Sequence, residues 1–289
     1  MRGDVSPPAG FDGASRRRFR YRPQMLPTLL TLGNLFCGYL ASAKAFDALA
    51  LPHAPGSPTP EMLALLEWSG WLIFLGMIFD ALDGRVARLS GGASPAGAQL
   101  DSLADVVSFG VAPALLAKAI AEGVGGMDNR KMTLYFSVFF ALMAALRLAR
   151  YTAQHGDPEE AQLWFEGLPT PGGAAVIAGF AILLPDQDFR PGGAVLGLLP
   201  YATLFLGLLM VSRLPYAHVA NRFLRGRKPA HYLVLGMLGF VLSLTFHIEV
   251  VIAACVGAYA LSGPVIGLFR RRRGTPRPAA EPAGTESRP

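Results

Sequence analysis

The sequence is poor in charged residues and contains almost no cysteine. Asp, Glu, Lys and Arg make up 16% of its 289 residues, whereas 52% are hydrophobic, which is the composition of a membrane protein rather than a soluble domain. The two cysteines, Cys37 and Cys255, lie within apolar segments and far from any CxxC or Cys/His spacing. They are expected to be packing residues, which excludes a disulfide framework and a cysteine-based metal site. The chain also lacks an internal repeat of fixed period and a linker long enough to divide it, so a single membrane domain is expected.

The sequence does contain long apolar runs. Most are about 20 residues long, the length of helix that crosses a bilayer. We expect eight transmembrane helices near residues 25–46, 67–88, 98–121, 133–151, 172–186, 194–211, 231–246 and 249–269. Because backbone polar groups within lipid must be satisfied internally, the predicted fold is an all-α polytopic bundle rather than a sheet. The first run is too long, and its charged leader too extended, for a cleaved signal peptide, so an uncleaved first helix is expected.

Basic residues indicate the orientation of these helices. Arginines cluster before the first run and after the last, at residues 2–22 and 270–288. The connections after the second, fourth and sixth runs are also basic, whereas the intervening connections carry only Arg130, Lys131 and Arg190. By the positive-inside rule, we expect a multi-pass protein of the inner membrane with both termini on the cytoplasmic side.

The distribution of positive charge also bears on partners and on domain organisation. The charges are spread over several short loops and form no recognisable module, so no nucleic-acid partner is expected. The terminal clusters suit anionic lipid headgroups instead. Residues 1–24 and 274–289 are rich in Pro, Gly and charge without apolar periodicity, and we expect disordered tails there. Between the tails, we expect a six-helix core at residues 25–215 and additional transmembrane helices at 216–273.

One spaced pattern, D-x2-D-G-x2-A-R-x8-G-x3-D-x3-D, places acidic residues in this apolar chain. Its members are Asp80, Asp83, Gly84, Ala87, Arg88, Gly97, Asp101 and Asp105. The spacing puts the first five on one face of a helix and the last three on one face of the next helix, around a cytoplasmic turn. In antiparallel helices of equal rise, Asp80 is expected level with Asp105, and Asp83 level with Asp101. Bare carboxylates are costly at this depth, and hard divalent cations, Mg²⁺ or Mn²⁺, would balance them.

The other residues of the pattern suit a pyrophosphate. Gly84 and Gly97 would let a bulky ligand approach the backbone, and Ala87 extends that small surface. Arg88 can donate paired hydrogen bonds to a phosphate, and Ser94 in the turn is a further donor. The alternative interpretations are helix packing for the small residues, a topology anchor for the arginine, and a structural ion-pair network for the aspartates. Arg85 and Arg88 are too few to neutralise four carboxylates.

The pattern matches in full the signature of the CDP-alcohol phosphatidyltransferase family, whose integral membrane enzymes move a phosphatidyl or related group from a CDP-linked donor to an alcohol. Further segments resemble the phosphatidylserine synthase branch of that family. These segments are residues 31–38, 109–113, 146–151, 165–171 and 209–213. The resemblance covers roughly residues 25–215.

The resemblance implies a reaction and roles for individual residues. CDP-diacylglycerol and L-serine would give phosphatidylserine and CMP. Four aspartates, Asp80, Asp83, Asp101 and Asp105, would hold two divalent metal ions, with Asp80 and Asp101 bridging both ions and Asp105 acting as general base. The residues implied to contact the CDP-lipid are Thr31, Asn34, Gly84, Ala87, Arg88, Ser94 and Gly97. The active site would lie on the cytoplasmic side.

The acceptor is inferred from weaker signals. The carboxylate of serine calls for a cation, which Arg147, Arg150 or Arg213 could supply, although each could instead be a topology anchor. The alternatives within the family are other acceptors, such as glycerol 3-phosphate, choline or inositol phosphate. An ion-coupled transporter is the alternative of another class, but it would need neither Arg88 nor two glycines at these spacings, and no Pro-broken helix pair occupies matching halves of the sequence. A second copy of the chain is a further candidate partner.

Overall fold

The computed structural model describes residues 25–272, with gaps at 53, 55, 90–94, 128, 155–163, 187, 189–190 and 218–247. The helical elements are α1 (Met25–Ala50), α2 (Pro60–Leu89), α3 (Pro95–Asp105), η1 (Val106–Val111), α4 (Ala112–Ala119), η2 (Ile120–Val124), α5 (Arg130–Gln154), α6 (Thr170–Ile182), α7 (Gly193–Val211) and α10 (Ile248–Arg272). Two short strands are present, β1 (Trp164–Glu166) and β2 (Pro215–Ala217). The predicted helical fold is confirmed for the described residues, with this small sheet as an unpredicted addition.

Six helical segments of the described part are long and apolar enough to cross a membrane. They are Met25–Ala50, Pro60–Ala87, Ala96–Val124, Arg130–Arg150, Gly193–Val211 and Ile248–Ile266. Each corresponds to a predicted span, as expected of an integral membrane protein. The predicted span at 172–186 instead forms α6, whose 13 residues extend only about 20 Å, less than a hydrocarbon core of about 30 Å. The predicted span at 231–246 and both predicted tails lie outside the described residues.

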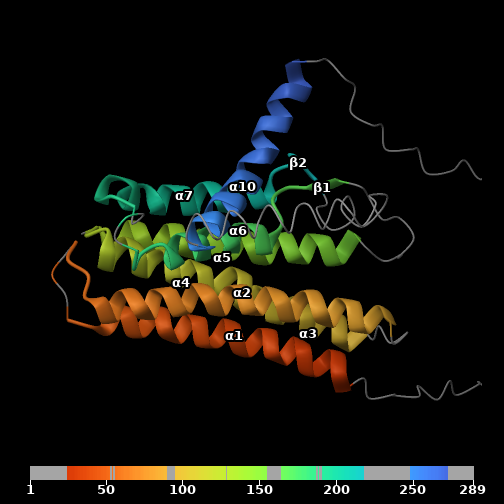
Figure 1. Cartoon of the computed structure of the whole chain (residues 1–289). Coiled ribbons are helices and arrows are strands. Elements are labelled where there is room, and N and C mark those ends of the chain that lie inside the picture. Colours follow the sequence, from red (N-terminus) through yellow and green to blue (C-terminus); the bar gives the residue numbers. More distant parts are fainter. Residues whose placement is uncertain are drawn as a thin grey trace, which may run out of the picture.

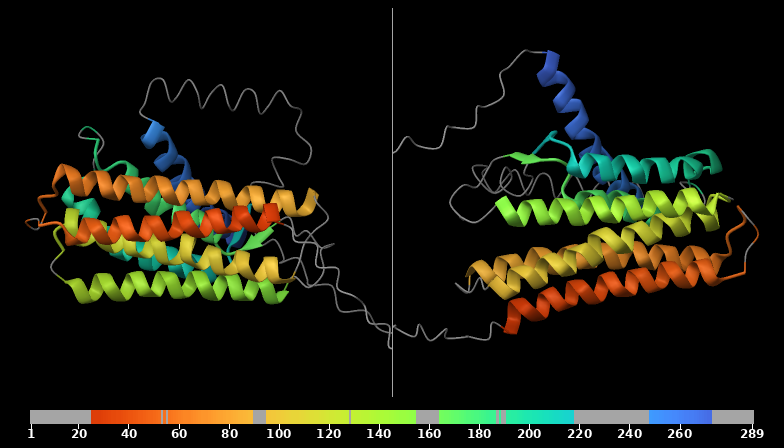
Figure 2. Two further views of the ribbon diagram at one scale, coloured as in Figure 1. Left: turned by 90° about the horizontal axis from the view of Figure 1, so that it is seen from below. Right: turned by 180° about the vertical axis from the view of Figure 1, so that it is seen from behind.

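The long helices lie side by side in a bundle (Figures 1 and 2). α1 packs most extensively on α2, α5 packs on α7, and α6 lies between α2 and α10. Alanines at positions 41, 45 and 48 are almost fully buried in α1. Such small side chains let helix backbones approach closely, which is how helices associate within lipid. α10 leans away from the bundle at its C-terminal end (Figure 1).

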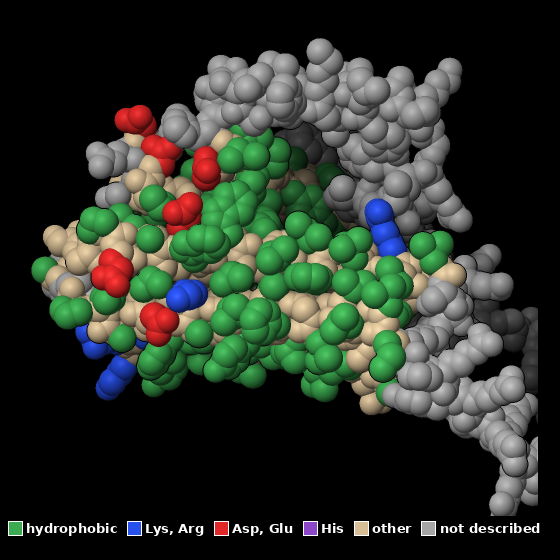
Figure 3. Space-filling model, turned by 60° about the horizontal axis from the view of Figure 1, so that its bottom comes forward, with side chains coloured by type: hydrophobic (Ala, Val, Ile, Leu, Met, Phe, Trp, Pro, Cys, Tyr) green, Lys and Arg blue, Asp and Glu red, His purple; other side chains and the backbone are tan. Residues whose placement is uncertain are grey.

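The surface of the bundle suits a lipid environment. In Figure 3, hydrophobic side chains cover the middle of the visible face, and the visible charged side chains lie toward the helix ends. Large apolar residues on several helices are exposed to the surroundings, among them Phe36 of α1, Leu142 of α5 and Leu198 of α7. In water such a surface would favour aggregation, whereas in a bilayer it is in contact with acyl chains.

The third span, residues 96–124, is one continuous helical path with two π-helical segments. η1 begins directly after Asp105, and η2 ends the span. π-Helical turns are rare and often occur at functional sites. Here η1 turns Ser108 toward α1, where its hydroxyl donates to the backbone carbonyl of Asn34 at 2.9 Å. Gly38 makes this approach possible, because a Cβ at that position would overlap Ser108.

The two-stranded sheet ties the end of α7 to the segment that precedes α6. β1 and β2 are antiparallel, with Phe165 opposite Tyr216. Beyond the sheet, the N–H of Gly167 donates to Leu214 and that of Leu168 donates to Leu209, at 2.8 and 3.0 Å. Gly167 has φ 83°, and a Cβ there would overlap the carbonyl of Met210. The connection into α6 is therefore held by backbone hydrogen bonds and has a glycine where only glycine fits.

Candidate functional site

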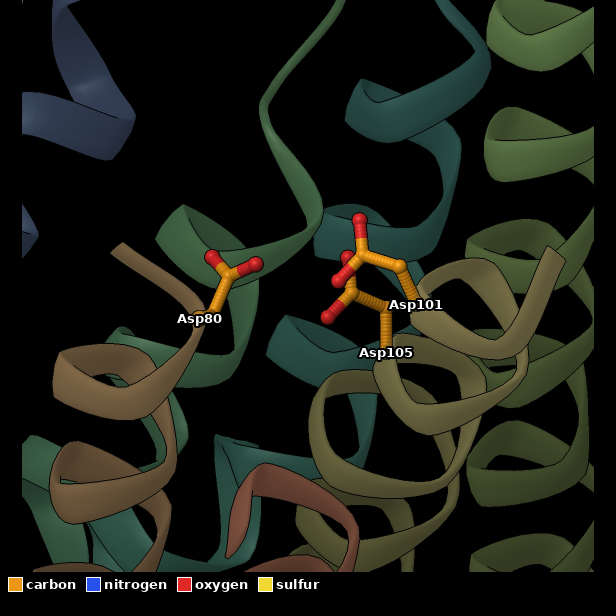
Figure 4. Close-up of side chains that lie close together, drawn as sticks. All are labelled: Asp80, Asp101 and Asp105. Carbon is orange, nitrogen blue, oxygen red and sulfur yellow. The ribbon is translucent and has the colours of Figure 1, made fainter. Parts of the chain in front are cut away.

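Three carboxylates meet between α2 and α3. Asp80 projects from α2, and Asp101 and Asp105 project from successive turns of α3 (Figure 4). One oxygen from each side chain lies within 4.8 Å of the other two. The i, i+4 spacing of Asp101 and Asp105 places both on the helix face that looks toward α2. The expected convergence of carboxylates is present for these three residues.

The fourth aspartate is held by a neighbouring helix. Asp83 is 4% exposed, and its Oδ2 accepts a hydrogen bond from the hydroxyl of Thr31 on α1 at 2.8 Å. Asp83 is still close enough to Asp80 and Asp101 for electrostatic repulsion. The hydrogen bond from Thr31 shows that α1 also holds this site, which the argument from α2 and α3 alone did not include.

Asp105 is also held from α1. The side-chain amide of Asn34 donates to Oδ1 of Asp105 at 3.0 Å, and both residues are buried. The backbone of Asn34 is fixed in turn by the hydroxyl of Ser108. Gly76 of α2 leaves room for the amide, since a Cβ there would lie 3.1 Å from Oδ1 of Asn34. Ser108 and Gly76 were not singled out in the sequence, although Ser108 is a polar residue in an apolar run and follows Asp105 by three positions.

The cluster contains buried oxygen atoms that have no partner. Within the described part of the chain, Oδ1 of Asp101 and Oδ1 of Asn34 accept no hydrogen bond. A buried polar atom without a partner is unfavourable, and a group of carboxylates without counter-charge is more so. Hard divalent cations bind oxygen ligands of this kind. The donor set and the unpartnered oxygens therefore fit a divalent metal ion.

The residues expected at a CDP-lipid are distributed around the aspartates. Thr31 and Asn34 are buried and bound to two of the four aspartates. Gly84, Ala87 and Arg88 follow Asp83 on α2, and Gly97 lies in the first turn of α3. Gly84, Ala87 and Gly97 are partly exposed. Ser94 lies outside the described residues.

The arginines expected at the acceptor differ in their surroundings. Arg147 is partly buried, and its Nη1 donates to the hydroxyl of Thr170 at 2.9 Å. Arg150, at the same end of α5, and Arg213, after α7, are exposed.

The depth of these arginines follows from the packing of α5 on the third span. A Cβ at Gly110 would lie 3.3 Å from Cβ of Ala144, and the hydroxyls of Ser102 and Thr152 are 3.4 Å apart. In this antiparallel register Arg147 is level with residue 107 and Arg150 with residue 104. Both therefore lie at the depth of Asp105.

Comparison with known proteins identifies a family and several relatives of the chain. The family model for CDP-alcohol phosphatidyltransferase matches residues 24–212. Three proteins named CDP-diacylglycerol–serine O-phosphatidyltransferase are similar to the chain. The one from Methanocaldococcus jannaschii is 39% identical over 161 residues, which cover 56% of this chain and 69% of that protein. The Helicobacter pylori protein is 38% identical over 50% of this chain and 59% of its own length. The Mycobacterium tuberculosis protein is 33% identical over 70% of this chain and 64% of its own length.

These alignments leave part of each relative uncovered, and two of the three cover less than two thirds of the relative's length. The family match, by contrast, extends over more than half of this chain and contains the three clustered aspartates, Asp83 and both α1 residues that hold them. The chain belongs to the CDP-alcohol phosphatidyltransferase family.

Proposed function

We propose that this protein transfers the phosphatidyl group of CDP-diacylglycerol to the hydroxyl of L-serine and releases CMP. The observation that carries the proposal is the half-buried carboxylate cluster of Asp80, Asp101 and Asp105 within the family motif. The choice of serine is supported by the similar proteins, which share the name CDP-diacylglycerol–serine O-phosphatidyltransferase. Residues 25–215 are the proposed catalytic domain.

The position of the cluster suits one lipid substrate and one soluble substrate. At a rise of about 1.5 Å per residue, Asp101 and Asp105 lie roughly 9 and 15 Å from the beginning of α3 at Pro95. We assign this end to the cytoplasmic side, on the basis of the basic segments at both termini. The acyl chains of the donor can then stay in the bilayer while serine enters from the cytoplasm.

We further propose that Asp80, Asp83, Asp101 and Asp105 would hold two divalent ions, Mg²⁺ or Mn²⁺. When bound, these ions would neutralise the pyrophosphate and the charge that develops on the departing CMP. Thr31 and Asn34 orient Asp83 and Asp105. Their hydrogen bonds fix the carboxylate rotamers before any ligand arrives, which lowers the free energy needed to organise the site.

The reaction is a displacement at phosphorus. The serine hydroxyl oxygen forms a bond to the phosphorus that carries the diacylglycerol, and the bond from that phosphorus to the CMP oxygen breaks, with its electron pair leaving on CMP. Asp105 accepts the hydroxyl proton. Because Oδ1 of Asp105 is engaged by Asn34, we assign the proton to Oδ2.

The remaining contacts are assigned by position. Gly84, Ala87 and Gly97 form the small surface beside the aspartates against which the nucleotide and pyrophosphate pack, with Arg88 and Ser94 as phosphate donors. Of the three arginines, Arg147 is the strongest candidate for the serine carboxylate, because it lies near the depth of Asp105 and is partly buried, whereas Arg150 and Arg213 are exposed. We assign Arg150 and Arg213 to the entrance through which serine reaches the site from the cytoplasm.

An acceptor assay tests the proposal. Purified protein in lipid vesicles would receive CDP-diacylglycerol, a divalent ion and one alcohol at a time, with CMP and the lipid product both measured. We expect CMP release with serine, and phosphatidylserine as the product in equal amount. CMP release with glycerol 3-phosphate and none with serine would refute serine as acceptor, and no CMP release with any alcohol would refute the transferase.

A further inference from the structure

α10 lies beyond residues 24–212, the segment that the family model matches. It nevertheless packs against α6, the helix whose first residue, Thr170, accepts the hydrogen bond from Arg147. The ring of Tyr259 in α10 lies on the first turn of α6. A Cβ placed on Gly172 would be 3.0 Å from Cε1 of Tyr259, so a side chain at this position would displace the ring. A second close approach occurs two turns further along α6, where a Cβ on Gly179 would be 3.2 Å from Cα of Ala253. Two glycines of α6 therefore form the surface on which α10 is seated.

A buried tyrosine of β2 fixes the position of α10 along its own axis relative to the rest of the bundle. The hydroxyl of Tyr216 donates to the backbone carbonyl of Ala260 at 2.9 Å, and Tyr216 is fully buried. Its ring lies 6.0 Å from that of Tyr259, centroid to centroid, and Gly263 allows the ring to lie against the α10 backbone. Burial, and secondarily the neighbouring Tyr259, raises the pKa of Tyr216 to about 12, so this hydrogen-bond donor stays protonated at physiological pH. The position of Tyr259 is consequently well determined.

The same turn of α6 also holds Arg147. Thr170, the first residue of α6, is fully buried and accepts the hydrogen bond from Nη1 of Arg147. Tyr259 is close enough to Arg147 for the two side chains to interact electrostatically. Arg147 and Tyr259 thus flank one helical turn, two residues apart at Thr170 and Gly172, although α5 and α10 are far apart in the sequence.

We propose that Tyr259 is a positioning residue for Arg147 and, through it, for the carboxylate of the amino-acid acceptor. The phenol oxygen of Tyr259 can accept a hydrogen bond from a guanidinium. Such a contact restricts a long side chain that would otherwise sample many rotamers. α10 then helps to form the acceptor site and is not only an additional membrane-spanning helix. This inference rests on the proposed function, since it gives Arg147 a carboxylate to bind.

The test compares two conservative tyrosine substitutions in the full-length protein. Tyr259→Phe keeps the ring on Gly172 and removes only the hydroxyl, whereas Tyr201→Phe makes the same change on the exposed face of α7, where the ring lies edge-on to Phe136. We expect Tyr259→Phe to raise the KM for serine about tenfold, the effect of one hydrogen bond to a charged group. The KM for CDP-diacylglycerol and the melting temperature should stay at the wild-type values. Tyr201→Phe should change none of the three.

A double-mutant cycle separates positioning from a structural role. In an Arg147→Ala background, Tyr259→Phe should have no further effect on the KM for serine, because the residue through which it acts is gone. A KM for serine that is unchanged in Tyr259→Phe, or an equal effect with and without Arg147, would overturn the inference. Equal losses for both substrates with a lower melting temperature would also overturn it and assign Tyr259 to helix packing.

The proposed function and this inference fail differently. If the wild-type protein releases CMP with glycerol 3-phosphate and not with serine, the serine assignment falls. The KM of Tyr259→Phe for that anionic acceptor then decides whether Tyr259 positions Arg147. If the wild-type protein uses serine and Tyr259→Phe has the same KM for serine as the wild type, the proposed function stands and the inference falls. No CMP release with any acceptor would remove both.

Discussion

The two ends of the third membrane span both carry acidic side chains that are at least half-buried, but only at one end does a described side chain pair with them as a counter-ion. Near its C-terminal end, Glu122 is 7% exposed and forms an ion pair with Lys118 at 2.8 Å. Its second oxygen accepts a hydrogen bond from Thr133 of α5. Near the N-terminal end, Asp101 and Asp105 face Asp80, and none of the lysine and arginine side chains that the structure describes forms an ion pair with these three.

The difference separates a structural charge from a functional one. Lys118 neutralises Glu122, so this end of the span needs no bound cation. The aspartates repel one another and leave Oδ1 of Asp101 without a partner, so their end of the span requires a cation. Substitutions at the two ends should accordingly affect different properties of the protein, and the following four predictions test that division.

The largest effect is expected at Asp105. Asp105→Asn should lower CMP release about 10³-fold, because the amide cannot accept the serine proton. Glu122→Gln is the matched control at the other end of the span, and it should leave activity within about twofold of wild type. Rates at saturating substrate, with folding checked by the melting temperature, would measure both. Full activity in Asp105→Asn would show that another group is the base.

Metal binding should stabilise only a protein with an intact cluster. A divalent ion at a hundredfold excess over its Kd stabilises the folded state by about 2.7 kcal/mol, which appears as a higher melting temperature. We expect this increase with Mg²⁺ or Mn²⁺ in the wild type and in Glu122→Gln, its removal by a chelator, and its loss in Asp101→Asn. An increase of wild-type size in Asp101→Asn would place the ion elsewhere.

Thr31 should have a smaller effect, because it acts by orienting Asp83. Thr31→Val keeps the shape of the side chain and removes the 2.8 Å hydrogen bond, so activity should fall about tenfold. Thr31→Ser retains the hydroxyl and should recover most of that loss. Steady-state rates at several metal concentrations would compare the two variants. If serine and valine at this position gave equal rates, the hydrogen bond would have no role.

The smallest effect on activity is expected at Lys118. Lys118→Met leaves Glu122 without its counter-ion and should lower the free energy of unfolding by roughly 1–3 kcal/mol, below the full penalty for a buried pair because the lysine side chain is 19% exposed. Activity below the melting temperature should stay within about twofold of wild type. Adding Glu122→Leu should restore much of the stability, since it removes the unpaired charge. A large loss of activity with unchanged stability would contradict the structural assignment of this pair.

Much of the fold was predictable because only a few kinds of backbone structure can cross a bilayer. Apolar runs of spanning length predicted six of the observed spans. The run at 172–186 was misleading because its apolar composition continues to Leu184, whereas α6 ends at Ile182, just before Pro185. The β1–β2 sheet was not predictable, since its strands have three residues each and are separated by α6 and α7.

The site was predictable where it depends on helix periodicity and not where it depends on a third helix. The spacing of Asp80, Asp101 and Asp105 was enough to bring these residues together. The attachment of Asp83 to Thr31 required knowledge of how α1 packs, which no spacing within α2 and α3 contains. The approach of Tyr259 to the turn that holds Arg147 depends on Gly172, an unremarkable glycine in a glycine-rich segment.

The π-helical segment η1 lies between these two acidic ends, and it sets their relative angle. A π-turn contains one residue more than an α-turn, and each residue advances about 100° around a helix axis. The π-turn absorbs that additional residue while the helix on either side keeps its phase, so Lys118 and Glu122 face α5 while Asp101 and Asp105 face Asp80. Deleting a single residue within 106–111 should restore an ordinary α-helix and leave the ion pair beside Thr133, whereas deleting one residue of α4 ahead of Lys118 should turn the ion pair about 100° away from it. Helical phase, as well as composition, decides which acid meets which neighbour.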